Sequence, residues 1–119
     1  MRAYSDNEVA LLREQRDLPP EARQCPVCNA IGIRRYYRMS YGRSSPTISS
    51  CVWCPNCHSY TGSTGPAAGR VVTSDPLLEM ENPPTDDPEG MENFLTVLDR
   101  LWDEGALPQE VIGGRERGG

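Results

Sequence analysis

The chain contains no lysine, only one histidine and only one phenylalanine among its 119 residues. All twelve basic residues are therefore arginine. This bias is typical of GC-rich coding, although arginine is also the better bidentate ligand for carboxylate and phosphate. The single histidine, His58, directly follows a cluster of cysteines. Hydrolytic catalysis has few groups to work with here, so the sequence predicts a protein that is not an enzyme.

Long apolar runs are also missing. The N-terminal stretch MRAYSDNEVALLREQ has no apolar run long enough for a secretory or membrane segment, so a cytoplasmic chain without membrane contact is expected. Hydrophobic residues make up only 37% of the chain, beside eleven glycines and eleven prolines. A bound metal ion would add stability that such a lean core cannot supply. In a reducing compartment, five cysteines, an odd number, indicate metal or redox chemistry rather than disulfides.

Acidic residues are absent from the middle of the chain. Residues 25–70 hold five arginines and neither aspartate nor glutamate. Residues 71–119 hold twelve acidic residues and three arginines. The central part is therefore expected to attract anions and the C-terminal part to attract cations, so two opposite kinds of partner have to be considered.

Each end of the chain predicts a helix. Ser5-Asp6-Asn7-Glu8 has the S-x-x-E form of a capping box and predicts a helix over residues 5–17. Asp87 can cap a second helix over residues 88–106, which Gly105 is placed to stop. The apolar residues of this second helix recur at the spacing of one helix face, and they are Met91, Phe94, Leu95, Leu98, Leu101 and Trp102.

The middle of the chain predicts strands. Residues 33–39 alternate in polarity and form the first strand, and residues 47–53 form the returning strand. Residues 59–61 predict a short third strand before a turn rich in glycine. Val71-Val72 could add a short edge strand.

Four of the five cysteines form a repeated pattern. CPVC at 25–28 and CPNC at 54–57 are two C-x-x-C turns with the predicted hairpin between them. This arrangement brings four thiolates around one tetrahedral ion. Asn29 and His58 follow the two turns and tolerate the positive φ expected there. The predicted metal ligands are Cys25, Cys28, Cys54 and Cys57.

Cys51 and His58 are rival ligands that have to be weighed. Cys51 lies on the predicted strand without a proline turn before Cys54, and we interpret it as a buried apolar side chain. His58 directly follows a ligand, so its ring is expected to point away from the metal, as a turn or surface residue. A thioredoxin-like redox role is disfavoured because neither C-x-x-C opens a helix in a βαβ unit.

The CPVC and CPNC turns with a hairpin between them resemble the knuckles of the zinc-ribbon, or rubredoxin-like, group. The resemblance implies one structural zinc ion on the four cysteines. Together with the two predicted helices, it indicates a small α+β fold, in which a three-stranded zinc ribbon is flanked by an N-terminal helix and a C-terminal amphipathic helix. The expected segments are an N-terminal helix and linker at 1–22, the zinc ribbon at 23–66, an irregular acidic linker at 67–87, the amphipathic helix at 88–106 and a flexible tail at 107–119.

One candidate function is nucleic-acid binding, as in a transcription accessory protein. Arginines interleaved with aromatic residues suit phosphate contact and base stacking. The alternative is that the arginines offset the negative charge of a tetrathiolate site while the aromatic residues form a small core. The candidate nucleic-acid residues are Arg34, Arg35, Tyr36, Arg38 and Arg43.

The other candidate function is protein binding through the acidic C-terminal part, with Asp99, Trp102, Asp103 and Glu104 as candidate contacts. The stretches VWCPNCHSYTGSTGP at 52–66, DPLL at 75–78 and FLTVLDRLWDEGALPQ at 94–109 resemble small actinobacterial zinc-ribbon proteins of uncharacterised function. Such proteins look like partners in polymorphic toxin loci. The resemblance implies an acidic immunity-type protein that masks a basic toxin. A rubredoxin-like iron electron carrier is a third reading, and no small-molecule substrate is expected.

Overall fold

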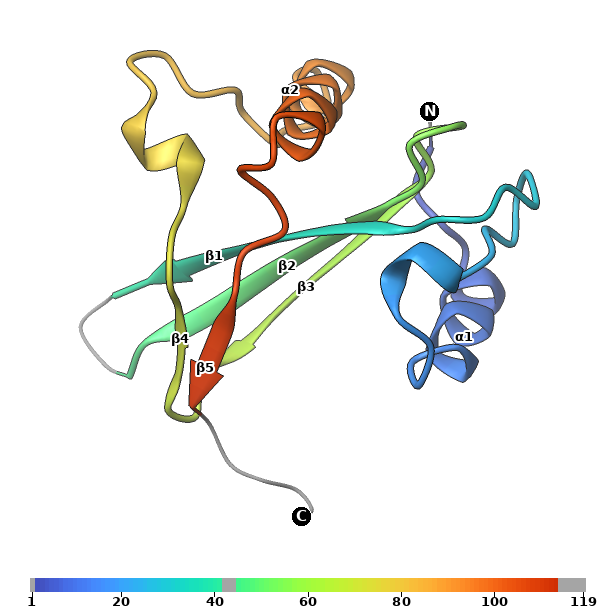
Figure 1. Cartoon of the computed structure of the whole chain (residues 1–119), viewed down its shortest axis with the longest axis horizontal. Coiled ribbons are helices and arrows are strands. Elements are labelled where there is room, and N and C mark those ends of the chain that lie inside the picture. Colours follow the sequence, from blue (N-terminus) through green and yellow to red (C-terminus); the bar gives the residue numbers. More distant parts are fainter. Residues whose placement is uncertain (1, 42–44, 114–119) are drawn as a thin grey trace.

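The chain folds into two α-helices, a three-stranded antiparallel sheet and a second, two-stranded sheet, a small α+β arrangement (Figure 1). The computed structural model describes residues 2–41 and 45–113. Its elements, with η for a short 3-10 helix, are α1 (Asp6–Glu14), η1 (Pro20–Ala22), β1 (Arg34–Ser40), β2 (Thr47–Trp53), β3 (Tyr60–Pro66), β4 (Arg70–Val72), η2 (Pro76–Glu79), α2 (Met91–Asp103) and β5 (Val111–Gly113).

The larger sheet has the order β1-β2-β3, so consecutive strands are neighbours. Tyr36 lies opposite Cys51, which lies opposite Gly62, and these three positions share the face that α2 covers. Figure 1 shows α2 on this side of the sheet and α1 on the other side, near one end of the strands. The predicted three-stranded antiparallel sheet is therefore confirmed.

Helix α1 begins as expected and ends earlier. The Ser5 side chain accepts the N–H of Glu8, and the Glu8 carboxylate accepts the N–H of Ser5, which completes the capping box. The helix ends at Glu14, and the N–H groups of Gln15 and Arg16 then donate to carbonyl oxygens three residues back, in tighter turns. The side chain of Gln15 pairs with the backbone of Gln24. Its amide donates to the carbonyl oxygen at 2.9 Å and accepts the N–H at 2.7 Å.

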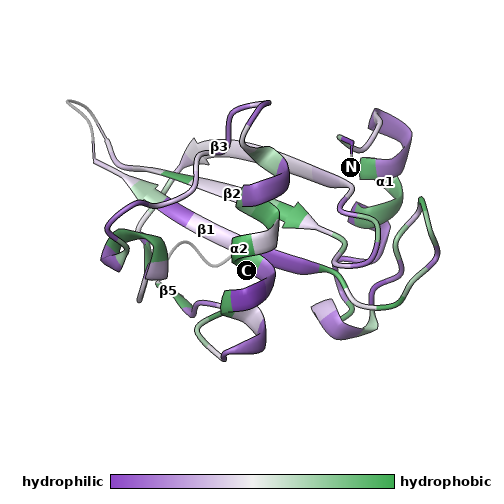
Figure 2. Cartoon of the chain, turned by 90° about the horizontal axis from the view of Figure 1, so that it is seen from above, coloured by the Kyte–Doolittle hydropathy of each residue, from purple (hydrophilic) through white to green (hydrophobic). Residues whose placement is uncertain are grey.

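Helix α2 begins three residues later than predicted. Asp87 does not cap it; its carboxylate accepts the N–H of Gly90 in the preceding turn, and Gly90 occupies the N-cap position. Gly105, with φ of 86°, follows the helix as predicted. Figure 2 shows hydrophilic and hydrophobic residues interspersed along α2 where it lies over the sheet. Its buried residues are Met91, Phe94, Leu95, Leu98 and Leu101.

Strand β3 is longer than the predicted residues 59–61. It extends to Pro66 because small residues, among them Gly62 and Gly65, lie flat against β2. A Cβ on Gly62 would lie 3.1 Å from the carbonyl oxygen of Ser50, so the close pairing favours glycine there.

The segments expected as linker and tail are more ordered than predicted. Val71 and Val72 form β4, which pairs with β5 at the start of the expected tail. Leu77 is buried on η2. Leu107 and Gln109 are buried as well, because they pack on the sheet rather than extend into solvent. Residues 107–113 therefore belong to the fold, and the rest of the expected tail lies outside the described residues.

Two separate clusters of buried residues hold the molecule together. The larger one lies between α2 and the sheet, and its members are Tyr36, Trp53, Leu77, Met91, Phe94, Leu95, Leu98, Leu101 and Leu107. We call it the α2 core. The smaller one joins α1 to the two C-x-x-C turns, and its members are Tyr4, Leu12, Cys25, Ile33 and Cys54. We call it the cysteine core.

Candidate metal centre

The sulfur atoms of Cys25, Cys28, Cys54 and Cys57 lie within 4.8 Å of one another. Cys25 Sγ is 3.7 Å from Cys57 Sγ, and Cys28 Sγ is 3.6 Å from Cys54 Sγ. A disulfide would need about 2.0 Å, and all four cysteines are free. Four sulfurs held about 2.3 Å from one tetrahedral ion lie about 3.8 Å apart. The set could therefore hold one metal ion.

The two C-x-x-C turns have the same local structure. In each, the first cysteine's sulfur accepts a backbone N–H two residues on, from Val27 or Asn56, at 3.4 Å. The first cysteine's carbonyl oxygen accepts the N–H of Asn29 or His58 at 2.9 and 2.8 Å. Asn29 and His58 have φ of 67° and 57°, which confirms the positive φ predicted for both. Two copies of one turn thus face each other across the sulfur set.

Polar groups lie close to the sulfurs. The Asn56 side-chain amide donates to Cys28 Sγ at 3.3 Å and lowers the pKa of that thiol to about 6. The hydroxyl of Tyr4 lies 3.0 Å from Cys25 Sγ, and the Cys57 thiol donates to the Ser59 hydroxyl oxygen at 3.2 Å. Burial raises the pKa of Cys54 to about 12, so a cation is needed to bring the whole set to four thiolates.

Cys51 stays outside the sulfur set. It lies in the middle of β2 on the face toward α2, packed against the α2 core. Burial raises the pKa of its thiol to about 12, so it remains protonated and uncharged. This agrees with the interpretation of Cys51 as a buried apolar side chain.

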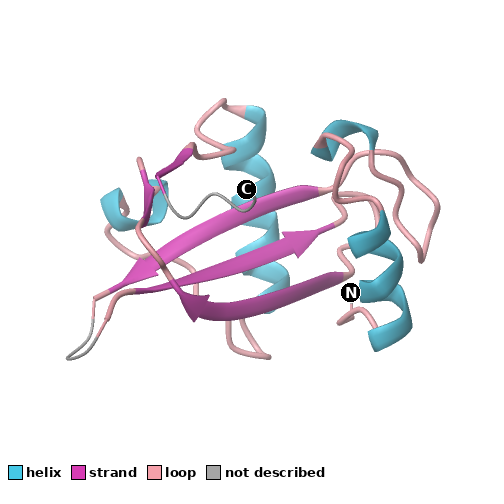
Figure 3. Cartoon of the chain, turned by 90° about the horizontal axis from the view of Figure 1, so that it is seen from below, coloured by secondary structure: helices cyan, strands magenta, loops and turns pink. Residues whose placement is uncertain are grey.

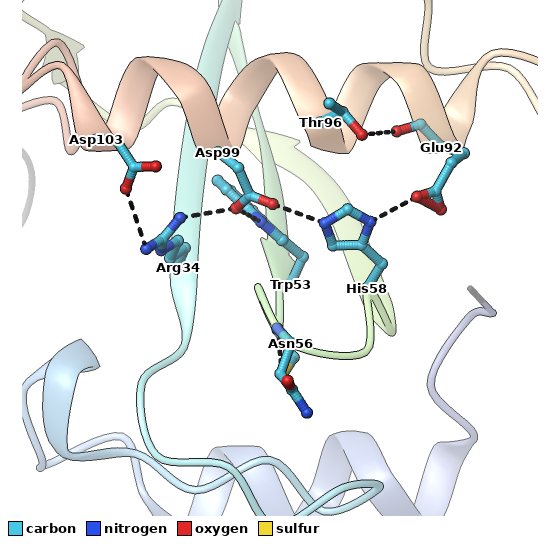
Figure 4. A network of polar contacts seen from close by, with 9 residues as sticks. Arg34, Trp53, Asn56, His58, Glu92, Thr96, Asp99 and Asp103 are labelled. Atoms are coloured by element: carbon cyan, nitrogen blue, oxygen red, sulfur yellow. Dashed lines mark hydrogen bonds and ion pairs between the residues drawn. The ribbon is translucent and has the colours of Figure 1, made fainter.

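His58 was predicted to be only a turn or surface residue, and the structure gives it more contacts than that. It follows the second turn as expected, but its ring reaches α2 (Figure 4). Nε2 lies 2.6 Å from an Asp99 oxygen and Nδ1 lies 2.8 Å from a Glu92 oxygen. Burial lowers the pKa of the imidazole, but the bonds to these carboxylates outweigh burial and raise it. His58 is thus held between two carboxylates that favour its protonated form.

Asp99 is the centre of this polar network. One of its oxygens accepts both the Trp53 indole N–H and an Arg34 guanidinium N–H, each at 2.8 Å, while the other oxygen faces His58 (Figure 4). The network therefore joins β1, β2 and the second cysteine turn to α2. The sequence contained a signal for the shared position of two of these carboxylates. Glu92 and Asp99 are seven residues apart, so they lie on the same side of the helix.

The candidate nucleic-acid residues occupy both faces of β1. Tyr36 is buried and its hydroxyl donates to Asp75 at 2.7 Å. Arg34 and Arg38, on the same face, pair with Asp99 and Asp86 at 2.8 and 3.5 Å.

On the opposite face of β1, the Arg35 guanidinium carbon lies 5.7 Å from the centre of the Tyr37 ring. Arg43 lies outside the described residues. The structure therefore does not gather the candidate nucleic-acid residues into one exposed patch among the residues it describes.

Some of the candidate protein-binding residues face the interior of the fold and others are exposed. Asp99 points inward, and Trp102 packs edge-on against Trp53 with ring centres 6.3 Å apart. Asp103 and Glu104 are exposed at the end of α2. Only these last two lie on an outer surface.

Comparisons with models of known families, with curated proteins and with solved structures find no match. Among the described residues, no helix is both long and apolar enough to cross a membrane.

Proposed function

We propose that the chain is a cytoplasmic, non-catalytic zinc protein that acts by binding another protein. The sulfur set of Cys25, Cys28, Cys54 and Cys57 is the observation that carries the zinc assignment. Four cysteines complete a tetrahedral shell and leave no open position for substrate or activated water. Both ring nitrogens of His58 face carboxylates, so neither is free to act as a base. The ion's role is then structural.

Zinc is proposed over iron because the two cysteine turns with a hairpin between them resemble those of zinc ribbons, in which the ion is structural. Iron takes the same four thiolates in rubredoxin-like proteins, so the ligands alone favour neither ion. An iron protein would be red and redox-active as isolated, whereas a zinc protein is colourless.

The acidic surface supports a protein partner of opposite charge. Residues 81–110 hold nine carboxylates and one arginine. All of the nine except Asp99 are exposed, and they are Glu81, Asp86, Asp87, Glu89, Glu92, Asp103, Glu104 and Glu110. Such a surface steers a basic partner and repels nucleic acid. An immunity-type role, in which this surface masks a basic toxin, is the finer form of the proposal and rests on the sequence resemblance.

Nucleic-acid binding is the second candidate, and the geometry favours it less. Arg34 and Arg38 are paired with carboxylates and Tyr36 is buried, so three of the candidate contacts are already used within the fold. Retention on single-stranded DNA at low salt, lost when Arg35 is changed to Ala, would support this candidate over protein binding.

Affinity capture from the native cell tests the protein-binding proposal. The wild-type chain is expected to retain one stoichiometric basic partner, and a variant with Asp103→Lys and Glu104→Lys is expected to lose it. Glu21→Lys makes a matched control, because Glu21 is exposed on η1, outside the acidic surface. Absence of any partner on the wild-type chain would overturn the proposal.

A further inference from the structure

The two outer edges of the three-stranded sheet are finished differently. On β1, the backbone of Tyr37 is paired with the side chain of Gln109. The Tyr37 N–H donates to Oε1 at 2.8 Å, and Nε2 donates to the Tyr37 carbonyl oxygen at 2.6 Å. This amide occupies the place that a further strand would take, so the middle of the β1 edge is closed.

The edge of β3 is covered only where the strand begins. The N–H of Tyr60 donates to the carbonyl oxygen of Arg2, and the carbonyl oxygen of Tyr60 accepts the N–H of Tyr4. Tyr60 therefore directs its backbone groups away from β2. Because the direction alternates along an antiparallel strand, Gly62 and Thr64 direct theirs outward too.

The outward groups of Gly62 and Thr64 have no backbone partner among the described residues, and both residues are exposed. Figure 3 shows no drawn helix or strand running along this side of β3. The open edge ends at Pro66, which has no N–H and whose carbonyl oxygen accepts an N–H of Arg70 at 2.9 Å. The two residues thus offer two N–H and two C=O groups to an added strand.

A cavity adjoins the open edge on each face of the sheet. On the α1 side, a cavity of about 220 Å³ is lined by Thr61, Gly62 and Ser63 of β3 and by Arg13 and Arg16 of the α1 region, with Arg23 nearby. Arg13 and Arg16 form no ion pair within the described part of the chain.

On the α2 side, a cavity of about 170 Å³ reaches the same Gly62. Its lining includes Cys51, Tyr60, Met91 and Phe94, so most of its side chains are apolar. Side chains of a strand laid beside β3 would point alternately to the two faces. One set would meet the arginines and the other set would meet the apolar cavity.

We propose that the open edge of β3 binds an extended segment of a partner protein as a fourth strand, with carboxylate side chains toward Arg13 and Arg16 and apolar side chains toward Met91 and Phe94. Main-chain hydrogen bonds supply affinity in this mode, and pockets for alternate side chains supply specificity. This proposal rests on the protein-binding role. The open edge is separate from Asp103 and Glu104, so binding at the edge can be absent while the acidic surface still binds a partner.

A second copy of the chain suits this edge less well. Pairing two β3 strands about a two-fold axis would bring Ser63, Thr64 and glycines together, and these side chains are too small to fill the cavities. It would also place Arg13 and Arg16 of both copies on one face. The unpaired arginines therefore favour a partner segment that carries acids.

A synthetic peptide with alternating valine and glutamate, blocked at both ends, is the direct probe. Titrated into the ¹⁵N-labelled metal-loaded chain, it is expected to bind saturably and to slow amide exchange at Gly62 and Thr64. A peptide of alternating valine and lysine is expected to bind at least about fivefold more weakly, since it meets Arg13 and Arg16 with like charge. Unchanged exchange at Gly62 and Thr64, or equal binding of both peptides, would overturn the inference.

Thr64→Pro removes an outward N–H and leaves the backbone bonds to β2 in place, although it also loses the hydroxyl contact with Ser49, and it should abolish peptide binding. Thr64→Val is the matched control, because it keeps the N–H and loses only the hydroxyl contact with Ser49. The control should bind the peptide like the wild type. Full binding by a folded Thr64→Pro chain, or a dimer of the free wild type that this variant dissociates, would overturn the assignment to a partner segment. Capture of a native partner through Asp103 and Glu104 would then still stand.

Discussion

The cysteine core and the α2 core differ in the residue types that they bury. The α2 core buries nine residues, all of them large and none of them cysteine, and closes around a helix whose apolar stripe was plain in the sequence. The cysteine core buries five residues, two of which are cysteines. Apolar burial is enough to order the first region, whereas the proposed metal ion would cross-link the second. In this proposal, one chain combines an ordinary core with a metal-dependent one.

Loss of a metal ligand should lower the unfolding free energy most. The structural damage should be confined to the cysteine core. Cys54→Ser removes one of four ligands at a fully buried position, so the metal should be lost and the cost should exceed about 5 kcal/mol. Metal content and hydrogen exchange measure the result. Protection should vanish in α1 and both cysteine turns and persist in α2.

Cys51→Ser is the matched control for that prediction. It changes a cysteine in the same strand region that lies outside the sulfur set, so it should cost about 1 to 2 kcal/mol and keep the metal. Equal damage from Cys51→Ser and Cys54→Ser would mean that the ligands are wrongly assigned.

A cavity in the α2 core should cause the next largest loss of unfolding free energy. The damage should fall on the α2 core and spare the cysteine core. Leu98 is fully buried, so Leu98→Ala should cost about 2 to 5 kcal/mol of unfolding free energy while one metal ion stays bound. Thr96→Ala, on the exposed side of the same helix, should change stability little. Chemical denaturation with metal analysis tests both. Metal loss from Leu98→Ala at native conditions would show that the two cores are not separate.

The Asp99 network links the two cores, and breaking it should cost less. Asp99→Asn removes the charge that faces Arg34 and His58, and the expected loss is about 2 to 4 kcal/mol. Asp103→Asn, at an exposed partner 3.5 Å from Arg34, should cost less than about 1 kcal/mol. Similar costs for the two variants would contradict a central role for Asp99.

The same network predicts a pH dependence with a definite sign. The pKa of His58 is raised in the folded chain, so its contribution is fully present below the unfolded pKa of about 6.5 and is lost as pH rises through the folded pKa. The difference in unfolding free energy between the wild type and Asp99→Asn should therefore shrink above neutral pH. A difference that grows with pH would contradict the charged state of His58.

The smallest effect is expected at the closed sheet edge. Gln109→Ala leaves the N–H and C=O of Tyr37 without their side-chain partner, at a cost of about 1 to 3 kcal/mol. Glu110→Ala, at the exposed neighbouring position, should be close to neutral. Thermal unfolding of the two variants gives the comparison. Equal melting temperatures would mean that the Gln109 amide does not support the β1 edge.

Local patterns in the sequence predicted most of the fold. The capping box at Ser5, the apolar stripe of α2 and the repeated cysteine turns each depend on neighbouring residues, so spacing alone revealed them. The contacts of Gln109 with Tyr37 and of His58 with Asp99 join residues far apart in the chain. No local period reports such contacts, and polar residues near the C-terminus therefore looked like a tail.

X-ray absorption at the zinc edge of the purified chain identifies the ion and its neighbours. One zinc ion per chain is expected, with four sulfur neighbours at about 2.3 Å and no nitrogen neighbour. A shell that contains nitrogen would bring His58 into the site, and an iron edge in place of zinc would make the protein an electron carrier. Either result would contradict a structural zinc ion held by Cys25, Cys28, Cys54 and Cys57 alone.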